Sequence, residues 1–249
     1  MERAAVLGRL NWRLVEVVEL VDEAPGVRSL VLDRGGAPAH RPGQHVDVRL
    51  TAEDGYEAQR SYSIASAPED EHLVLTVERL DDGEVSPYLT EELRPGDELE
   101  LRGPIGGYFV WEEALGGPLL LVAGGSGVVP LAAMLRHRAA GGSDVPVRLL
   151  YSARSYDDVI FREELERLGE LDGVEVVYTL TRAQPEGWTG YARRVDRDLL
   201  QEVAWPADEA PLVYVCGPTR FVETVASNLV DLGHAPERIR TERFGPTGG

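Results

Sequence analysis

The sequence predicts two domains of different fold class: an N-terminal antiparallel Greek-key β-barrel over residues 1–113 and a C-terminal doubly wound α/β domain with a parallel sheet over residues 114–249. Short strands with alternating apolar residues fill the first part, whereas continuous apolar runs followed by helical stretches fill the second. The length of 249 residues permits two cores of ordinary size, and residues 116–118 mark the expected joint.

The barrel prediction rests on short strands separated by turns. Apolar residues occupy every second position in residues 42–50, and Leu73, Leu75 and Val77 repeat this pattern before the turn at residues 81–83. Further strands are expected over residues 27–33, 61–66 and 98–102. Strands at this spacing are typical of a small antiparallel barrel.

The second part alternates between buried strands and helices. Residues 119–123 form an unbroken apolar run that leads through glycines into a helical stretch over residues 131–140. The same unit recurs, with strands expected at residues 147–151, 174–180 and 212–216 and helices at residues 158–168 and 220–232. This alternation predicts a parallel sheet with helices on both faces.

Composition excludes several classes of function. The net charge is −18, and every one of the 25 basic residues is an arginine, without the clustering that a nucleic-acid-binding face needs. No apolar run approaches the roughly 18 residues of a membrane span, and no secretory signal follows Met1. We therefore expect a cytoplasmic protein that binds neither nucleic acid nor membrane.

Cysteine and histidine usage limits the metal chemistry. Cys216 is the single cysteine, which excludes an internal disulfide and a cysteine-ligated iron–sulfur cluster on this polypeptide. The five histidines (His40, His45, His72, His137 and His234) show no metal-ligand spacing, so no metal site is expected.

A glycine-rich turn follows the first predicted parallel strand. Gly125, Ser126 and Gly127 stand where a strand ends and a helix begins, so backbone N–H groups can approach a pyrophosphate at the helix N-terminus. Pro130 replaces the third glycine of the dinucleotide fingerprint, and such glycines are also compatible with a tight connection alone.

The next two strand ends carry cations. Arg154 ends one predicted strand and Thr181–Arg182 the following one, where an NAD-preferring site would offer a carboxylate to the ribose hydroxyls. Two guanidiniums and a hydroxyl suit a 2′-phosphate, although solvated loop arginines would look the same.

Two barrel motifs are candidates for an anionic ligand. Strand alternation places Arg60 and Tyr62 on one face and Ser61 and Ser63 on the other. The turn at residues 83–87 opens a helix, which is another potential anion site. Each motif alone is equally typical of an ordinary polar strand or turn.

Together the motifs resemble those of the ferredoxin–NADP reductase superfamily, in particular its bacterial flavin-dependent reductases that serve ferredoxins and oxygenases. The match follows the family's order along nearly the whole chain, through RSYS (60–63), GEVS (83–86), RGPIGGYF (102–109), GGSGVVP (124–130), CGP (216–218) and ERF (242–244).

The resemblance implies a flavin site on the barrel. Arg60 would hold the flavin phosphate, Tyr62 would lie against the isoalloxazine, and Ser63 would hydrogen-bond near N5. The other residues expected to contact the flavin are Ser61, Val77, Gly83, Glu84, Val85 and Ser86. FAD is the expected flavin, and FMN stays open.

The resemblance also implies a nucleotide site on the sheet. Gly125, Ser126 and Gly127 would pack against the pyrophosphate, and matching arginines in related reductases favour NADPH over NADH. Cys216, Gly217 and Pro218 would lie beside the nicotinamide, Glu242 close to the reaction centre, and Phe244 over the flavin. Ser63, Cys216 and Glu242 are thus the expected catalytic residues. The alternative to these functional roles is a packing role for Cys216, Tyr62 and Phe244 and a solvated carboxylate for Glu242. Residues 245–249 follow Phe244, whereas plastid-type members of the family end on the aromatic residue.

The implied activity is hydride transfer from NADPH or NADH to flavin and then single-electron transfer to a separate ferredoxin or oxygenase component. A small acceptor, such as free flavin, a ferric chelate or a quinone, is an alternative, as is a role as electron-transfer subunit of a larger complex. Because ferredoxins are usually acidic too, we predict an arginine-rich rim around the flavin edge.

Overall fold

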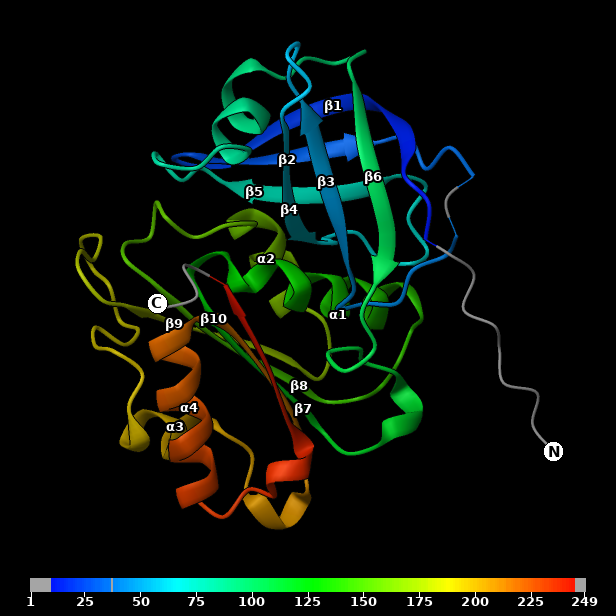
Figure 1. Cartoon of the computed structure of the whole chain (residues 1–249). Helices are drawn as coiled ribbons and strands as arrows, with labels where there is room; N and C mark the ends of the chain where they lie inside the picture. Colours follow the sequence, from blue (N-terminus) through cyan, green and yellow to red (C-terminus); the bar gives the residue numbers. More distant parts are fainter. Residues whose placement is uncertain (1–9, 37, 245–249) are drawn as a thin grey trace, which may run out of the picture.

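A computed structural model describes residues 10–36 and 38–244 and contains two sheets (Figure 1). A six-stranded antiparallel sheet forms the N-terminal part, and a five-stranded parallel sheet with helices on both faces forms the C-terminal part. The fold class predicted from the sequence is therefore confirmed.

The antiparallel sheet curls into a barrel. Its strands are β1 (Arg13–Ala24), β2 (Val27–Leu32), β3 (His45–Thr51), β4 (Glu57–Ser63), β5 (Leu73–Glu78) and β6 (Glu98–Ile105). Their order, β4-β3-β6-β1-β2-β5, is the non-sequential order of a Greek key, and a bridge between Ile64 and Leu75 joins the two edges. The interior holds sixteen buried apolar residues, and the short helix η1 (Tyr88–Glu92) contributes Leu89 to them.

Two barrel strands differ from the sequence prediction. β1 was not expected, because its RLVEVVELVDEA sequence mixes acidic and apolar residues without strict alternation, yet it pairs with both β2 and β6. β4 spans Glu57–Ser63 rather than residues 61–66, because residues 57–60, which are mostly polar, pair with residues 48–51 of β3. Backbone pairing with a distant strand outweighed the local apolar pattern.

The parallel sheet has the order β11-β10-β7-β8-β9. Its strands are β7 (Leu119–Gly124), β8 (Val147–Ala153), β9 (Val174–Leu180), β10 (Leu212–Pro218) and β11 (Ile239–Phe244). The α-helices are α1 (Val128–Ala140), α2 (Arg162–Gly169), α3 (Arg197–Val203) and α4 (Thr219–Asp231), and the 3₁₀ turns are η2 (Glu113–Leu115), η3 (Gly125–Gly127), η4 (Ala207–Glu209) and η5 (Pro236–Arg238). The helices α1 and α2 cover one face, and α3 and α4 cover the other.

The sequence prediction did not include α3 or β11. α3 is only seven residues long, too short for a clear helical period. β11 is an edge strand with the sequence IRTERF, and its single partner β10 leaves most of its side chains partly exposed.

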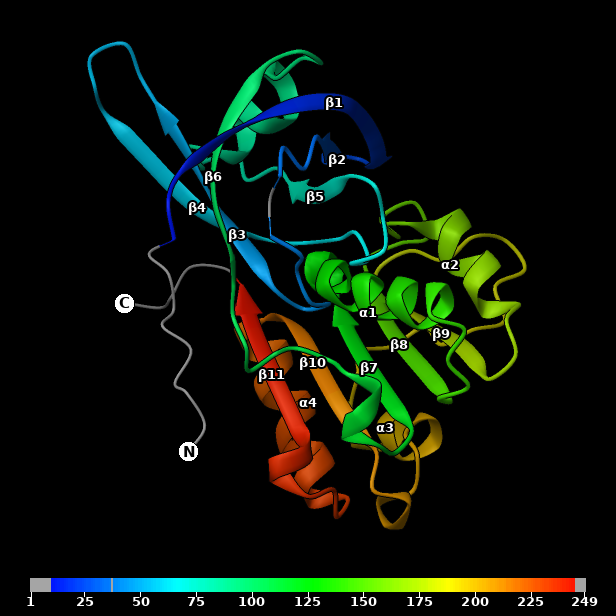
Figure 2. The same cartoon turned by 90° about the vertical axis from the view of Figure 1, so that its right-hand side faces the viewer.

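Specific contacts fix the barrel against the parallel sheet, with α1 between them (Figure 2). Arg136 of α1 donates from Nη1 to the Ala65 carbonyl at 2.6 Å, and the Tyr214 hydroxyl of β10 donates to the Val110 carbonyl at 2.7 Å. The guanidinium of Arg240 donates to the same carbonyl at 2.5 Å. None of the helices within residues 10–36 and 38–244 has the length and apolar character that crossing a membrane requires.

Candidate active site

The order of the parallel strands creates a crevice between β7 and β10. The chain runs from β7 outward to β8 and β9 and then returns to β10 on the other side of β7, so connections leave in opposite directions at this point. In open α/β sheets, ligands bind outside the carboxyl ends of the strands at such a switch point. Figure 2 shows these strand ends directed toward the barrel.

Glycines allow the backbone to close tightly at this crevice. A Cβ atom on Gly127 would lie 2.1 Å from the Cys216 carbonyl oxygen and 2.7 Å from the Gly217 nitrogen, so only glycine lets α1 begin directly against β10. Gly125 has φ +55° and nothing within 4 Å of a built Cβ, which leaves its backbone open to a ligand. The turn therefore has the shape that a pyrophosphate site needs.

A cleft of about 870 Å³, which is open to solvent, lies in front of this turn. The sheet contributes Gly124, Gly125, Ser126, Pro218 and Phe244 to its wall, among others, and the barrel contributes Ala24, Pro25, Val27 and Glu78. The cleft is thus formed by both halves of the molecule, as transfer between two bound cofactors requires.

Cys216 and Glu242 are direct partners in the β10–β11 pairing, and Pro218 pairs with Phe244. Burial raises the pKa of the Cys216 thiol well above its usual range, and the nearby Glu242 carboxyl adds to this effect. Burial also raises the pKa of Glu242 to about 7. Since Glu242 and Phe244 are two positions apart on one strand, they share a face at the crevice. Residues 245–249 lie outside the described part of the chain.

The cations at the ends of β8 and β9 are adjacent. The backbone N–H of Arg182 donates to the Arg154 carbonyl at 2.8 Å, and the Thr181 hydroxyl donates to the Ala153 carbonyl at 3.1 Å. The Arg154 guanidinium lies 3.5 Å from Asp158 and 3.8 Å from Glu78. Arg154 and Thr181 line the cleft, whereas Arg182 is exposed beside it.

On the barrel, β4 places the RSYS residues in different surroundings. Tyr62 is half-buried against the barrel core, and burial raises the pKa of its hydroxyl to about 12. The Ser61 hydroxyl donates to Asp47 at 2.6 Å, and Asp47 also accepts from Arg102. Burial tends to raise the pKa of Asp47, but these two donors lower it. The hydrogen bond to Asp47 directs the Ser61 side chain to the strand face opposite Arg60 and Tyr62. Ser63 ends the strand opposite His45.

The turn at residues 83–86 is held by its own side chains. The Ser86 hydroxyl accepts from the Leu80 N–H at 3.1 Å, and a Cβ on Gly83 would lie 2.8 Å from this hydroxyl. Val85 is fully buried in the barrel core, as is Val77 of β5. Neither valine is exposed, so the structure places both in the core behind the turn and strand surface.

Arg60 and the turn meet through Glu84. The Arg60 guanidinium donates from Nη2 to Glu84 Oε2 at 2.7 Å, and the Tyr56 hydroxyl donates to Oε1 at 2.6 Å. These two donors lower the pKa of Glu84. The structure thus brings together Arg60 and the turn, which are 24 residues apart, and adds Tyr56, which the sequence did not predict.

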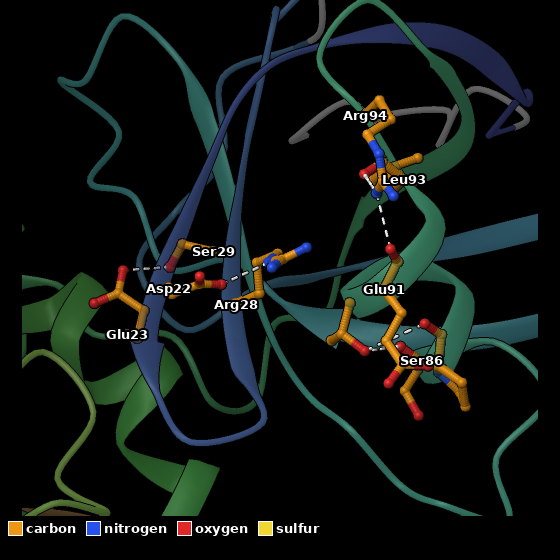
Figure 3. Close-up of polar contacts among 10 residues, drawn as sticks. Asp22, Glu23, Arg28, Ser29, Ser86, Glu91, Leu93 and Arg94 are labelled. Atoms are coloured by element: carbon orange, nitrogen blue, oxygen red, sulfur yellow. Dashed lines mark hydrogen bonds and ion pairs between the residues drawn. The ribbon is translucent and has the colours of Figure 1, made fainter.

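A second groove, of about 860 Å³ and open to solvent, lies beyond the β1–β2 turn, and Figure 3 shows the Asp22–Arg28 contact at its wall. Its cations are already paired: Arg28 with Asp22 at 2.7 Å, and Arg79 with Glu91. Glu23 accepts from the Ser29 hydroxyl at 2.6 Å, and burial raises the pKa of its carboxyl. Its lining carries three carboxyl groups and two guanidiniums, and no predicted site residue lines it.

Three residues that line the cleft were not predicted from the sequence, in addition to Tyr56 on the barrel. Glu78 and Asp158 flank Arg154, and Phe221 packs under Gly124, where a Cβ would lie 2.9 Å from its ring. None belongs to a recognisable motif: Asp158 lies only four positions after Arg154, whereas contacts between distant segments bring Glu78 and Phe221 to the site.

Comparison with known proteins identifies both halves. Residues 29–110 match the model of the oxidoreductase FAD-binding domain, and residues 121–227 match that of the oxidoreductase NAD-binding domain. The chain resembles the flavin and nucleotide domain of nitric oxide dioxygenase from Vibrio cholerae with a TM-score of 0.84 and 28% identity, covering 94% of this chain and 99% of that one.

Two curated relatives extend the match. A flavohemoprotein of Deinococcus radiodurans is 33% identical over 96% of this chain, which spans only 61% of that relative's length. Ferredoxin–NADP reductase B of Sorangium cellulosum is 37% identical over 93% of this chain and 96% of its own length. The agreement with the Sorangium protein extends over nearly the full length of both chains, so this chain belongs to the ferredoxin–NADP reductase superfamily, with an FAD-binding domain followed by an NAD-binding domain.

Proposed function

We propose that this chain takes hydride from NADPH, and less readily from NADH, and passes electrons singly to a separate ferredoxin or oxygenase component. The observation that carries the proposal is the cleft at the β7–β10 switch point, whose walls come from both the barrel and the sheet. The boundary between the two domains is proposed at residues 113 and 114, between β6 and β7. When bound, flavin accepts a hydride and releases its electrons one at a time.

The residues present fit a flavin on the barrel. Arg60 and Tyr56 already converge on one anionic group, the Glu84 carboxylate, which is the arrangement that a phosphate requires. Tyr62 offers a half-buried ring, and Ser63 a hydroxyl at the end of the same strand. Gly83 and Ser86 contribute backbone groups of the turn. Val85 of the turn and Val77 of β5 are fully buried and support these groups from the core. Ser61 acts by holding Asp47 rather than by contacting flavin.

On the sheet, the chain's residues orient the nucleotide. The backbone of Gly125, Ser126 and Gly127 faces the pyrophosphate, and the end of β10, from Cys216 through Gly217 to Pro218, supports the nicotinamide. Phe244 stands at the entrance to the flavin face and excludes water from it. Glu242 provides a carboxyl beside the nicotinamide, and Ser63 provides a hydrogen bond near flavin N5 from the barrel side.

The preference for NADPH is proposed from the adjacent cations Arg154 and Arg182. We expect Arg182→Ala to lower the ratio of NADPH to NADH efficiency about tenfold, because one charge-assisted contact with the 2′-phosphate is lost. The measurement is anaerobic stopped-flow reduction of the flavin with each nucleotide. Arg197→Ala, an exposed cation at the start of α3, is the control. An unchanged ratio in Arg182→Ala would refute the phosphate-clamp proposal.

The electron acceptor that we propose is a ferredoxin or an oxygenase component. The arginine-rich rim around the flavin edge stays a prediction, and two arginines of the barrel, Arg60 and Arg102, are paired with Glu84 and Asp47. The relative with matching length is named as a ferredoxin–NADP reductase, which favours a ferredoxin. We expect the reduced protein to be reoxidised faster by a ferredoxin than by a ferric chelate or a quinone in stopped-flow mixing. Faster reoxidation by the small acceptors would favour a free-standing reductase instead.

A further inference from the structure

Two donors on the barrel converge on a single carboxylate of the chain itself. The Tyr56 hydroxyl lies 2.6 Å from one oxygen of Glu84, and the Arg60 guanidinium lies 2.7 Å from the other. Tyr56 precedes β4 and Arg60 lies four positions later, so the chain presents both donors on the same side of the strand. About half of each of the Arg60 and Glu84 side chains is exposed, so a dissolved anion can reach this cluster.

A carboxylate and a phosphate use the same donors. Each oxygen of Glu84 accepts one charge-assisted or hydroxyl hydrogen bond, which is how two oxygens of a phosphate bind an arginine and a tyrosine. Each phosphate of the FAD pyrophosphate carries one negative charge, as a carboxylate does, and it cannot share the donors while Glu84 holds both. The Glu84 charge, once displaced, would stay in the turn near the phosphate and repel it.

We propose that Tyr56 and Arg60 together bind the flavin phosphate and that the Glu84 carboxylate is an internal competitor, which the flavin must displace. This inference rests on the proposed flavin site, and it assigns two further determinants of cofactor affinity. Tyr56 is a phosphate ligand outside the RSYS motif. Glu84 weakens the binding of phosphorylated flavins and leaves that of riboflavin, which has no phosphate, unaffected.

A neighbouring ion pair provides a matched control. Glu57, also on β4, lies 3.2 Å from Arg49 and is exposed to the same degree as Glu84. Arg49 is further held by Glu100 at 2.7 Å, on the outer face of β3 and β6. Glu57→Gln therefore removes one exposed negative charge from β4, the strand of Arg60, without removing a hydrogen-bond partner of Arg60 or Tyr56.

The test is the dissociation constant of FAD and of riboflavin, measured by fluorescence quenching with full-length protein stripped of flavin. In Glu84→Gln, we expect FAD to bind about fivefold more tightly, as the loss of one exposed charge interaction allows. Riboflavin should bind as it does to the unmodified protein, and Glu57→Gln should change neither constant. Equal or weaker FAD binding by a folded Glu84→Gln, verified by circular dichroism, would overturn the competitor role.

Tyr56 is tested in the Glu84→Gln background, where its hydroxyl has no carboxylate to hold. Adding Tyr56→Phe should weaken FAD binding about threefold, the effect of one lost hydrogen bond, and should leave riboflavin unchanged. If FAD binding is unaffected, Tyr56 is not a phosphate ligand and that part of the inference is wrong.

Arg60→Gln separates this inference from the proposed function. If Arg60→Gln weakens FAD binding but Glu84→Gln does not strengthen it, the flavin site stands and the competitor is refuted. If the unmodified protein binds neither FAD nor riboflavin, the proposed function itself fails.

Discussion

Gly127→Ala should lower the rate of flavin reduction by NADPH and NADH at least tenfold at subsaturating nucleotide concentrations. The added Cβ would meet the Cys216 carbonyl oxygen at 2.1 Å, its carbon at 2.4 Å and the Gly217 nitrogen at 2.7 Å. All three are backbone atoms of β10, so either α1 or the end of β10 must move. We expect a loss of about 3 kcal/mol in the free energy of unfolding and at least a tenfold rise in the nucleotide Kd.

Chemical denaturation and nucleotide titration measure these two effects separately. Gly142→Ala is the control, because Gly142 lies after α1 with φ +63° and nothing within 4 Å of a built Cβ. It should lose about 1 kcal/mol through backbone strain alone and keep its nucleotide affinity. A Gly127→Ala protein with normal nucleotide affinity would show that the crevice between β7 and β10 is not the nucleotide site.

Glu242→Gln should remove a pH step in hydride transfer near neutrality. Loss of hydride leaves positive charge on the nicotinamide ring, and an ionised carboxylate beside the ring stabilises that charge. Because burial raises the pKa of Glu242 to about 7, we expect the rate of flavin reduction to increase as the pH rises through this value. In Glu242→Gln the rate should be about tenfold lower at pH 8 and independent of pH in this window.

The same carboxyl predicts the pH dependence of stability. Its pKa is higher in the folded protein, about 7, than the ordinary value of 4.5, so the folded state binds more protons between these values. The contribution of Glu242 to stability is therefore full below pH 4.5 and is lost as the pH rises to about 7. Relative to the unmodified protein, Glu242→Gln should gain on the order of 2 kcal/mol in unfolding free energy at pH 8.

An exposed carboxyl serves as the comparison for both measurements. Glu237→Gln, in η5 before β11, should alter neither the pH profile of flavin reduction nor the pH dependence of unfolding. If Glu242→Gln retains the step near pH 7, another group titrates there and the role proposed for Glu242 is wrong.

Local patterns in the sequence were sufficient for the fold class, and the cofactor types followed from the resemblance that its motifs carry. The alternation in residues 42–50 and the apolar run at residues 119–123 predicted an antiparallel strand and a buried parallel strand, which the structure contains as β3 and β7. The glycines at residues 124–127 predicted the turn between β7 and α1. Such features are readable because period, turn residues and strand ends depend on neighbours in sequence.

Only the tertiary structure decided which motif residues are available to a cofactor. Asp47 engages Ser61 from 14 residues away, and Glu84 engages Arg60 from 24 residues away. The raised pKa of Glu242 depends on burial beside β10 at the edge of the sheet. These properties come from contacts between distant segments and from burial. Neither composition nor periodicity encodes them, because long-range contacts and burial are set only when the strands pair and the two halves of the molecule pack together.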